Sequence, residues 1–306
     1  MNFHLPDGTH VLERGWLSSN SVVLLGQHGA ALVDSGYATH APQTLALVDR
    51  ILKTQPLDLL VNTHLHSDHC GGNSALQARY PAVQTRIPPG ESEAVRQWDE
   101  AKLSYRATGQ KCPRFNFDAT LKPGTLVDMG AASWQIHAAP GHDPHAVVLF
   151  DPASRILISG DALWEKGFGV VFPEMWGEPS FDEVGATLDL IESLDPACVV
   201  PGHGSPFDQI DGALVAARER LNAFIRSPEK HARHAAKVLI KFKLLDARQI
   251  SLAAFDAWIR EAGYLDQIRH RFFSDQSLGE WVKELLNELV KSGVARAEGD
   301  LILDAP

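Results

Sequence analysis

Short apolar runs and helix-like periodicities alternate along the first two thirds of the chain. Apolar residues at 21–25 and 30–33 flank Gly26-Gln27-His28-Gly29, which predicts a β-hairpin. Apolar positions at helical spacing predict helices over 42–54 and 181–194. Further buried strands are expected over 57–63, 134–138, 146–150, 155–158 and 198–200. Interleaved strands and helices predict a layered α/β fold, and the hairpin links indicate mixed sheets.

The last third changes character and is predicted to be mainly helical. Helical patterns cover 211–225, 229–245 and 251–262, and Ser277-Leu278-Gly279-Glu280 has the spacing of a capping box before a helix that stops at Gly293. Strands over 294–297 and 301–303 around a Glu-Gly-Asp turn predict a closing hairpin. We therefore expect a domain over residues 1–212 and a winged-helix-like C-terminal domain over residues 213–306.

Composition and charge narrow the class of protein. The chain has 306 residues, 44% hydrophobic and 22% charged, which is typical of a globular protein that buries a sizeable core. The net charge is −10, and the acidic excess lies before Leu214, with 13 Lys and Arg against 25 Asp and Glu. That excess disfavours a polyanionic partner for the larger domain.

The sequence also carries signals of location. No apolar run approaches the roughly 18 residues of a membrane span, and the N-terminus lacks the basic and apolar regions of a signal peptide. The three cysteines have no short spacing. We therefore expect a cytoplasmic protein with no membrane partner.

The segment Thr63-His64-Leu65-His66-Ser67-Asp68-His69 is the strongest chemical signal. It places three imidazoles and a carboxylate directly after a predicted strand. On a strand, His64 and His66 would point the same way, whereas Asp68 and His69 fall where the chain leaves it. Imidazole and carboxylate ligands together suit zinc, and also iron or manganese.

Three later segments repeat this arrangement of an apolar strand that ends in a glycine beside one histidine or aspartate. They are Ala139-Pro140-Gly141-His142, Ser159-Gly160-Asp161 and Pro201-Gly202-His203. Strand ends and the loops after them are where layered α/β folds gather their functional sites. The pattern therefore adds His142, Asp161 and His203 to the candidate metal ligands.

Taken together, the spacing His64-x-His66-x-Asp68-His69 and these three residues resemble the metallo-β-lactamase fold superfamily over roughly residues 20–207. An aspartate at the place of Asp161 resembles its glyoxalase-II-like branch. The resemblance implies an αββα sandwich with two metal ions, two Zn²⁺ being favoured and Fe or Mn being alternatives. It also implies that Asp161 bridges the two ions. One ion would bind His64, His66 and His142, and the other Asp68, His69 and His203.

The resemblance further implies a metal-dependent hydrolase. A metal-bridged hydroxide would attack the carbonyl of an ester, thioester or lactone in a small or medium-sized substrate, with Asp68 as the catalytic residue that orients it. Relatives that hydrolyse β-lactams carry Cys or Ser in place of Asp161, so a primary β-lactamase role is not expected. Three alternatives stay open: a phosphodiesterase or endoribonuclease with the same two metals, a mononuclear-iron persulfide dioxygenase, and a non-catalytic regulatory member of the fold.

Several residues near the expected ligands allow two interpretations. Asp143 could accept a hydrogen bond from a ligand imidazole or cap the local turn, and His145 could support a ligand or be structural. Four aromatic residues follow Asp161 closely and would either line an apolar substrate pocket or form a small satellite core. They are Trp164, Phe168, Phe172 and Trp176.

The C-terminal module has several candidate roles. It could pack on the catalytic domain, line the substrate cleft, form a homo-oligomer contact or bind nucleic acid. Its Lys and Arg residues alternate with Glu and Asp along the predicted helices, which is typical of a solvated face. Nucleic acid is therefore not favoured as a partner, and a small-molecule substrate is expected.

Overall fold

The computed structural model describes residues 4–305, and the chain divides into two compact units. The first unit contains the chain up to Leu103 together with Lys111–Asn222, and the second contains Ser104–Gln110 and the chain from Ala223 onward. Helix α7 (Ile210–Arg226) runs across the division. The expected domain boundary after residue 212 falls inside this helix, so the domain limits remain a prediction.

Two mixed sheets form the centre of the first unit. In the first sheet, β1 to β3 are antiparallel and β3 to β6 are parallel, and the predicted hairpin is confirmed by the pairing of Gly26 with Gly29. Its strands are, in order, β1 (Thr9–Leu12), β2 (Ser21–Gly26), β3 (Gly29–Val33), β4 (Leu59–Val61), β5 (Gln84–Ile87) and β6 (Ala119–Thr120).

The second sheet is antiparallel except for the parallel β10–β11 pair. Its strands are β7 (Leu126–Met129), β8 (Ala132–Ala138), β9 (Val147–Asp151), β10 (Ile156–Gly160) and β11 (Cys198–Pro201).

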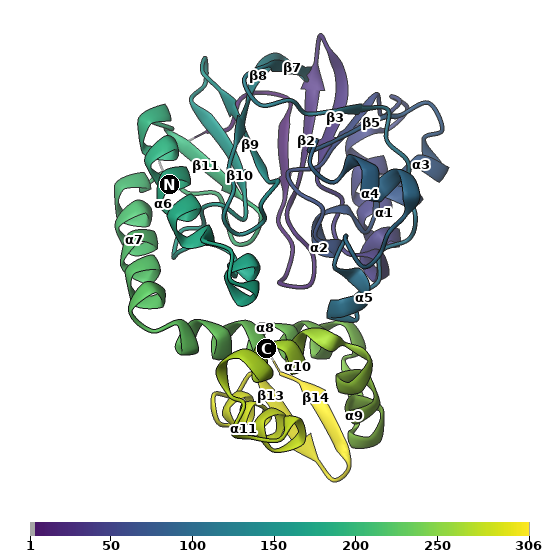
Figure 1. Ribbon diagram of the computed structural model, residues 1–306. Coiled ribbons are helices and arrows are strands. Elements are labelled where there is room, and N and C mark those ends of the chain that lie inside the picture. Colours follow the sequence, from purple (N-terminus) through teal and green to yellow (C-terminus); the bar gives the residue numbers. More distant parts are fainter. Residues whose placement is uncertain (1–3, 306) are drawn as a thin grey trace. The chain divides into compact units, whose positions relative to one another are not determined.

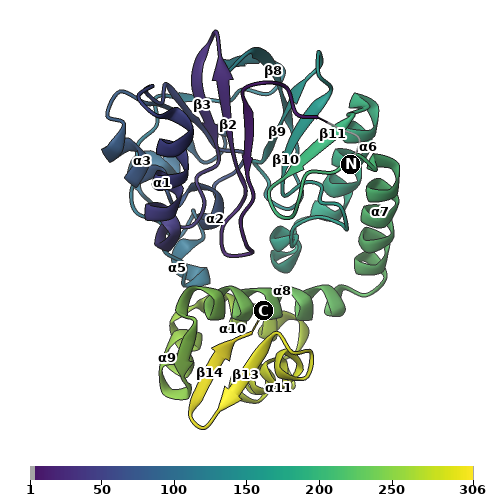
Figure 2. The same cartoon turned by 180° about the vertical axis from the view of Figure 1, so that it is seen from behind.

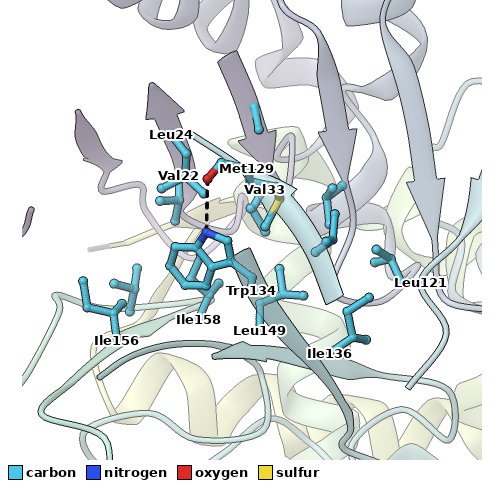
Figure 3. Packing of buried hydrophobic residues seen from close by; sticks show 14 of the residues in the cluster. Val22, Leu24, Val33, Leu121, Met129, Trp134, Ile136, Leu149, Ile156 and Ile158 are labelled. Atoms are coloured by element: carbon cyan, nitrogen blue, oxygen red, sulfur yellow. Dashed lines mark hydrogen bonds between the residues drawn. The ribbon is translucent and has the colours of Figure 1, made fainter. Parts of the chain in front are cut away.

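The main hydrophobic core lies between the two sheets (Figure 3). Successive side chains of a strand point to opposite faces, so Val22 and Leu24 enter this core while Val23 joins the cluster under the helices. Trp134 is buried in the core and donates its indole N–H to the carbonyl of Met129 at 3.3 Å. This hydrogen bond removes the cost of burying an unpaired indole N–H.

Helices cover the outer faces of the sheets (Figure 1). Helices α1 (Ala41–Leu52) and α3 (Asn73–Arg79) bury Val48, Leu52 and Leu76 against the first sheet. Helix α6 (Ser180–Leu194) flanks the second sheet and buries Val184, Leu188 and Ile191 at helical spacing. The αββα layering is thus confirmed. Short helices occupy the loops: η1 (Ala38–His40), α2 (Ser67–Cys70), α4 (Ser92–Gln97) and η2 (Phe172–Trp176).

The second unit is mainly helical, as the sequence predicts. The capping box is present, since the Ser277 hydroxyl accepts from the Glu280 amide and the Glu280 carboxylate accepts from the Ser277 amide. The predicted hairpin is also present, and Figure 2 shows β13 beside β14. A short strand, β12, extends this sheet in the order β12-β14-β13. The elements are α5 (Tyr105–Thr108), α8 (Pro228–Ala247), β12 (Gln249–Ser251), α9 (Leu252–Glu261), α10 (Gly263–Phe272), α11 (Leu278–Lys291), β13 (Ala295–Glu298) and β14 (Leu301–Asp304).

Across residues 4–305, no helix combines the length and the apolar character needed to cross a bilayer.

Candidate metal centre

The candidate ligands lie where strands of both sheets end. His64, His66, Asp68 and His69 come after β4, Asp161 follows β10 directly, and His142 and His203 lie in the loops after β8 and β11. The structure brings all seven side chains together. Three overlapping groups have ligand atoms within 4.8 Å of one another: His64, His66 and His142; His64, His69 and Asp161; and Asp68, His69 and His203.

His64 and His66 are not on a strand, which corrects the sequence-based picture of two neighbours on one strand face. Strand β4 already ends at Val61, and His66 immediately precedes helix α2. The loop still brings His64 Nε2 to 3.1 Å from His66 Nδ1. Asp68 lies in the first turn of α2, so the chain turns toward a second group of ligands.

Three imidazoles form the first ligand group. His142 Nε2 is 2.9 Å from His66 Nδ1, and His142 Nδ1 is 2.5 Å from the carbonyl of Val170. Because a carbonyl only accepts, His142 Nδ1 carries the proton and Nε2 of the neutral ring presents a lone pair. Burial and the neighbouring His66 lower the pKa of His142 to about 4. Burial likewise holds the pKa of His64 well below its usual value. This group therefore offers neutral nitrogen donors.

The second ligand group contains a carboxylate. Asp68 Oδ2 is 3.1 Å from His203 Nε2, and His69 Nδ1 is 2.8 Å from the carboxylate of Asp34. Burial alone would lower the pKa of His69, but Asp161 and Asp34 raise it well above its usual value. Burial opposes ionisation of Asp68, yet the hydrogen bond from His203 lowers the pKa of that carboxyl. This group thus combines a carboxylate with an imidazole whose protonated form is favoured by Asp161 and Asp34.

Asp161 lies between the two groups. Its Oδ1 is 3.3 Å from His69 Nε2, and its Oδ2 is 3.5 Å from His142 Nε2 and 3.9 Å from His203 Nε2. Burial would raise the pKa of Asp161, but His69 and His203 hold it well below its usual range. One ionised carboxylate therefore faces ligands of both groups.

The donor set fits a pair of cations. His69 Nε2 is buried without a hydrogen-bond partner, and it faces the other ligands. Nitrogen donors about 3.3 Å apart are expected around a tetrahedral ion with bonds of about 2.0–2.1 Å. The 2.9 and 3.1 Å separations around His66 Nδ1 are close to that value. A cation would accept the lone pairs that the rings direct at one another.

Two glycines permit the close approach of loops at the centre. A Cβ on Gly202 would collide with the Asp161 carboxylate, and a Cβ on Gly169 would collide with the His142 ring. A side chain at either position would displace a candidate ligand.

Two residues that the sequence did not single out hold candidate ligands in place. Asp34 accepts from the amide and hydroxyl of Thr63 at 2.9 and 2.8 Å and also from His69. Asn20 donates to the carbonyls of Pro201 and Gly204, which flank His203. Asp34 directly follows β3 and precedes Ser35-Gly36. It therefore shows the same strand-end signal as the ligands and could have been found from it.

The structure places Asp143 and His145 in the turn after His142. Asp143 Oδ1 accepts the backbone N–H of His145 at 2.7 Å, which is the turn-capping arrangement. Asp143 Oδ2 is 3.8 Å from His66 Nε2, a distance of charge proximity rather than hydrogen bonding. The ring of His145 packs closely on Gly90.

The aromatic residues after Asp161 differ in position. Trp164 is half-buried and donates its indole N–H to Asp161 Oδ1 at 3.2 Å. Phe172 is half-buried, with its ring centroid 6.1 Å from that of His66. Phe168 is buried under the guanidinium of Arg220, so it has the least surface to offer a ligand. Trp176 is half-buried at the end of η2.

Known proteins resemble both the sequence and the fold of this chain. Residues 14–203 match the family model described as the Metallo-beta-lactamase superfamily. A hydroxyacylglutathione hydrolase of Acidiphilium cryptum is 32% identical over 181 residues, which cover 55% of this chain and 63% of the relative. The human acyl-coenzyme A thioesterase MBLAC2 is 27% identical over 228 residues, or 66% of this chain and 80% of the relative.

A solved structure extends the likeness in fold beyond the matched residues. A metallo-beta-lactamase family protein from Thermus thermophilus has a TM-score of 0.59 at 18% identity, and the match covers 98% of this chain and all of that one. The curated relatives are matched over less of their length, since the chain spans 63% and 58% of two hydroxyacylglutathione hydrolases. With its αββα layers, clustered ligands and a family match over most of the first unit, the chain belongs to the metallo-beta-lactamase superfamily.

Proposed function

We propose that this chain is a dinuclear metal-dependent hydrolase that cleaves the acyl bond of a thioester, ester or lactone. The observation that carries the proposal is the convergence of five imidazoles and two carboxylates into three overlapping groups, with the Asp161 carboxylate facing His69, His142 and His203. A bound metal pair supplies an acidified water molecule and Lewis-acid polarisation of the carbonyl oxygen.

The residues of the chain prepare the site for that chemistry. Asp34 and the Val170 carbonyl fix the ring orientations of His69 and His142, so that their Nε2 atoms face inward. Asp68 is the proposed catalytic residue, because its lowered pKa keeps it an acceptor that can orient a water molecule. No serine or cysteine nucleophile is required.

Thioesters are the first substrate class to test. Two relatives carry names that specify acyl-glutathione and acyl-coenzyme A as their substrates, and both compounds are thioesters. Esters and lactones present the same kind of carbonyl. The metal ligands favour acyl transfer to water in general, so a panel of acyl substrates is the direct way to identify the preferred one.

We also propose the identity of the metal, the location of the protein and the role of its second domain. Zinc is the favoured metal, with iron and manganese as alternatives, because imidazole and carboxylate ligands suit all three. A cytoplasmic location is proposed, and no disulfide joins cysteines within residues 4–305. The order of helices, β12 and the β13–β14 hairpin supports a winged-helix-like second domain. Its proposed role is packing or self-association rather than binding of nucleic acid.

The test begins with metal analysis of protein purified without added metal. The protein is then assayed with and without a chelator on thioester, lactone, phosphodiester and β-lactam substrates. We expect about two metal ions per chain, thioester or lactone hydrolysis that the chelator abolishes, and recovery of activity when metal returns. His66→Ala should abolish turnover, with circular dichroism showing that the fold persists.

Other outcomes would replace the proposal. Phosphodiester cleavage without acyl hydrolysis would indicate a phosphodiesterase or endoribonuclease. One iron per chain with oxygen consumption on a persulfide would indicate a dioxygenase. A metal-loaded protein that turns over none of these substrates would indicate a non-catalytic member of the fold.

A further inference from the structure

An exposed tryptophan lies directly beside the ligand centre. Trp16 is 59% exposed, although an indole is among the side chains that gain most from burial. Its ring stacks on the ring of His203, with centroids 5.3 Å apart and an interplanar angle of 14°. One face of the indole therefore covers a candidate ligand, and much of the ring remains available for a further contact.

The backbone fixes the position of Trp16 relative to the ligands. Trp16 lies in a tight turn closed by the hydrogen bond from the Ser18 amide to the Gly15 carbonyl. The next two amides, those of Ser19 and Asn20, donate to the carbonyls of Asp68 and Gly202 at 2.9 and 2.6 Å. The turn is thus attached to two of the loops that carry ligands.

Trp164 completes an aromatic corner with Trp16. The two indoles meet edge to face, with centroids 5.4 Å apart, and Trp164 also meets His203 at 5.5 Å. The hydrogen bond from Trp164 Nε1 to Asp161 fixes this second ring against the shared carboxylate. We call Trp16 and Trp164 the indole corner.

A third aromatic residue lies against the other ligand group. The ring centroid of Phe172 is 6.1 Å from that of His66 and 6.5 Å from that of His142. Each ligand group thus has an aromatic neighbour, but only the indole corner contains a ring that is mostly exposed. Aromatic side chains grouped beside a few convergent polar groups are typical of ligand-binding sites.

We propose that the indole corner binds a planar, apolar acyl group of the substrate, such as an arylacetyl group, and so determines which acyl groups are accepted. This inference rests on the proposed hydrolase function. The exposed indole ring offers stacking and dispersion but no charge, so it favours an aryl acyl group over an acetyl group. Trp16 is then a specificity-determining residue, and Trp164 supports it while positioning Asp161.

The kinetic test compares S-phenylacetyl glutathione with S-acetyl glutathione, which differ only in the acyl group. The variants are Trp16→Ala, Trp16→Phe and the control Leu126→Ala, since Leu126 is 61% exposed on β7. In Trp16→Ala we expect the ratio of kcat/KM for the two substrates to fall about tenfold, mainly through KM. Trp16→Phe should keep most of the preference, and Leu126→Ala should match the unmodified protein.

A binding test needs neither metal nor turnover. Phenylacetamide and acetamide are titrated into metal-free protein, and the indole N–H signals are followed by NMR, with Trp16→Phe assigning one of them. We expect phenylacetamide, but not acetamide, to shift the Trp16 signal. The inference would be overturned if Trp16→Ala left the ratio of kcat/KM for the two substrates unchanged, or if phenylacetamide did not shift the indole N–H signals. Failure of all acyl hydrolysis would instead remove the proposed function, and the titration would still decide the role of Trp16.

Discussion

The two ligand groups of the centre reach similar geometry by different electrostatics. The first group consists of His64, His66 and His142, whose pKa values burial depresses. The second group contains the ionised Asp68 and His69, and nearby carboxylates raise the pKa of His69. Burial therefore favours the neutral form of the imidazoles in the first group, whereas nearby carboxylates favour the protonated form of His69 in the second.

The two groups also differ in the hydrogen-bond acceptor that orients an imidazole ring in each. His142 relies on a backbone carbonyl, that of Val170, which no substitution removes. His69 relies on the side chain of Asp34. The second group should therefore respond more than the first to substitution and to pH.

Asp161→Asn should have the largest effect, because Asp161 faces ligands of both groups. Removing the shared negative charge should reduce acyl hydrolysis by about 1,000-fold or more and lower the bound metal from two ions to one. Metal analysis and steady-state kinetics on one preparation check both effects. Retention of two tightly bound ions and normal turnover would show that the groups work independently.

Asp34→Asn should weaken the second group selectively. Loss of a carboxylate behind a ligand histidine costs roughly 10–100-fold in metal affinity. We expect competition with a chelator to show one weakened ion and one that is unchanged. Asp58→Asn is the matched control, since Asp58 accepts a backbone N–H, that of Ala30, at the end of the same sheet. Equal weakening of both ions would contradict the asymmetry.

The pH responses of His142 in the first group and His69 in the second should have opposite signs in metal-free protein. The folded-state pKa of His142 is about 4, below the unfolded value of about 6.5. Its contribution to stability is therefore present at neutral pH and is lost as pH falls through that interval. The pKa of His69 is raised, so its contribution is present in acid and is lost as pH rises through the raised value. Imidazole NMR titration should find His142 neutral and His69 protonated at about pH 6, and the reverse order would reject the comparison.

Glu91→Gln should have the smallest effect. Glu91 Oε2 is buried without a hydrogen-bond partner, and burial together with the charge of Asp143 raises the pKa of this carboxyl well above its usual value. The folded state then disfavours the carboxylate, so stability is lost as pH rises above the unfolded pKa of about 4.3. Replacing this carboxyl group by the neutral amide of Gln should raise the free energy of unfolding of metal-free protein by about 1 kcal/mol near pH 7. Near pH 4 the substitution should leave that free energy unchanged.

The control for that substitution is Glu93→Gln, at a carboxylate that is 64% exposed on helix α4, which Glu91 directly precedes. Denaturant unfolding at both pH values measures the difference. Asp143 lies 3.8 Å from His66, so we expect the gain from Glu91→Gln to shrink when metal occupies the first group. A gain that is the same at both pH values would show that the charge of Glu91 is not its cause.

The strand-end pattern is sufficient to predict which candidate ligands converge, and the alternation of strands and helices is sufficient to predict the layered fold. Long or strongly apolar segments such as β2, β8 and α6 are recognisable because burial on known faces leaves a periodic sequence. Strands β5 and β6 were missed, since Gln84-Thr85-Arg86-Ile87 and Ala119-Thr120 are short and partly polar, and their pairing depends on distant chain segments.

Residues that act through tertiary contacts are harder to predict from the sequence than the candidate ligands. Trp16 has no local motif, because its role follows from a turn whose amides bond to loops more than 45 residues away. The placement of His64 and His66 was predicted for the wrong reason, since a loop rather than a strand brings their nitrogens together. Tertiary hydrogen bonds decide both cases, and a single sequence does not display them.

The turn that carries Trp16 has a consequence for which substitutions its tip tolerates. Its attachments to the carbonyls of Asp68 and Gly202 use main-chain amides, which almost any amino acid provides. The identity of the residue at the tip can therefore drift through mutation while the ligand loops keep their places. On the role proposed for Trp16, a substitution at this one position changes the acyl preference and leaves the candidate metal ligands in place.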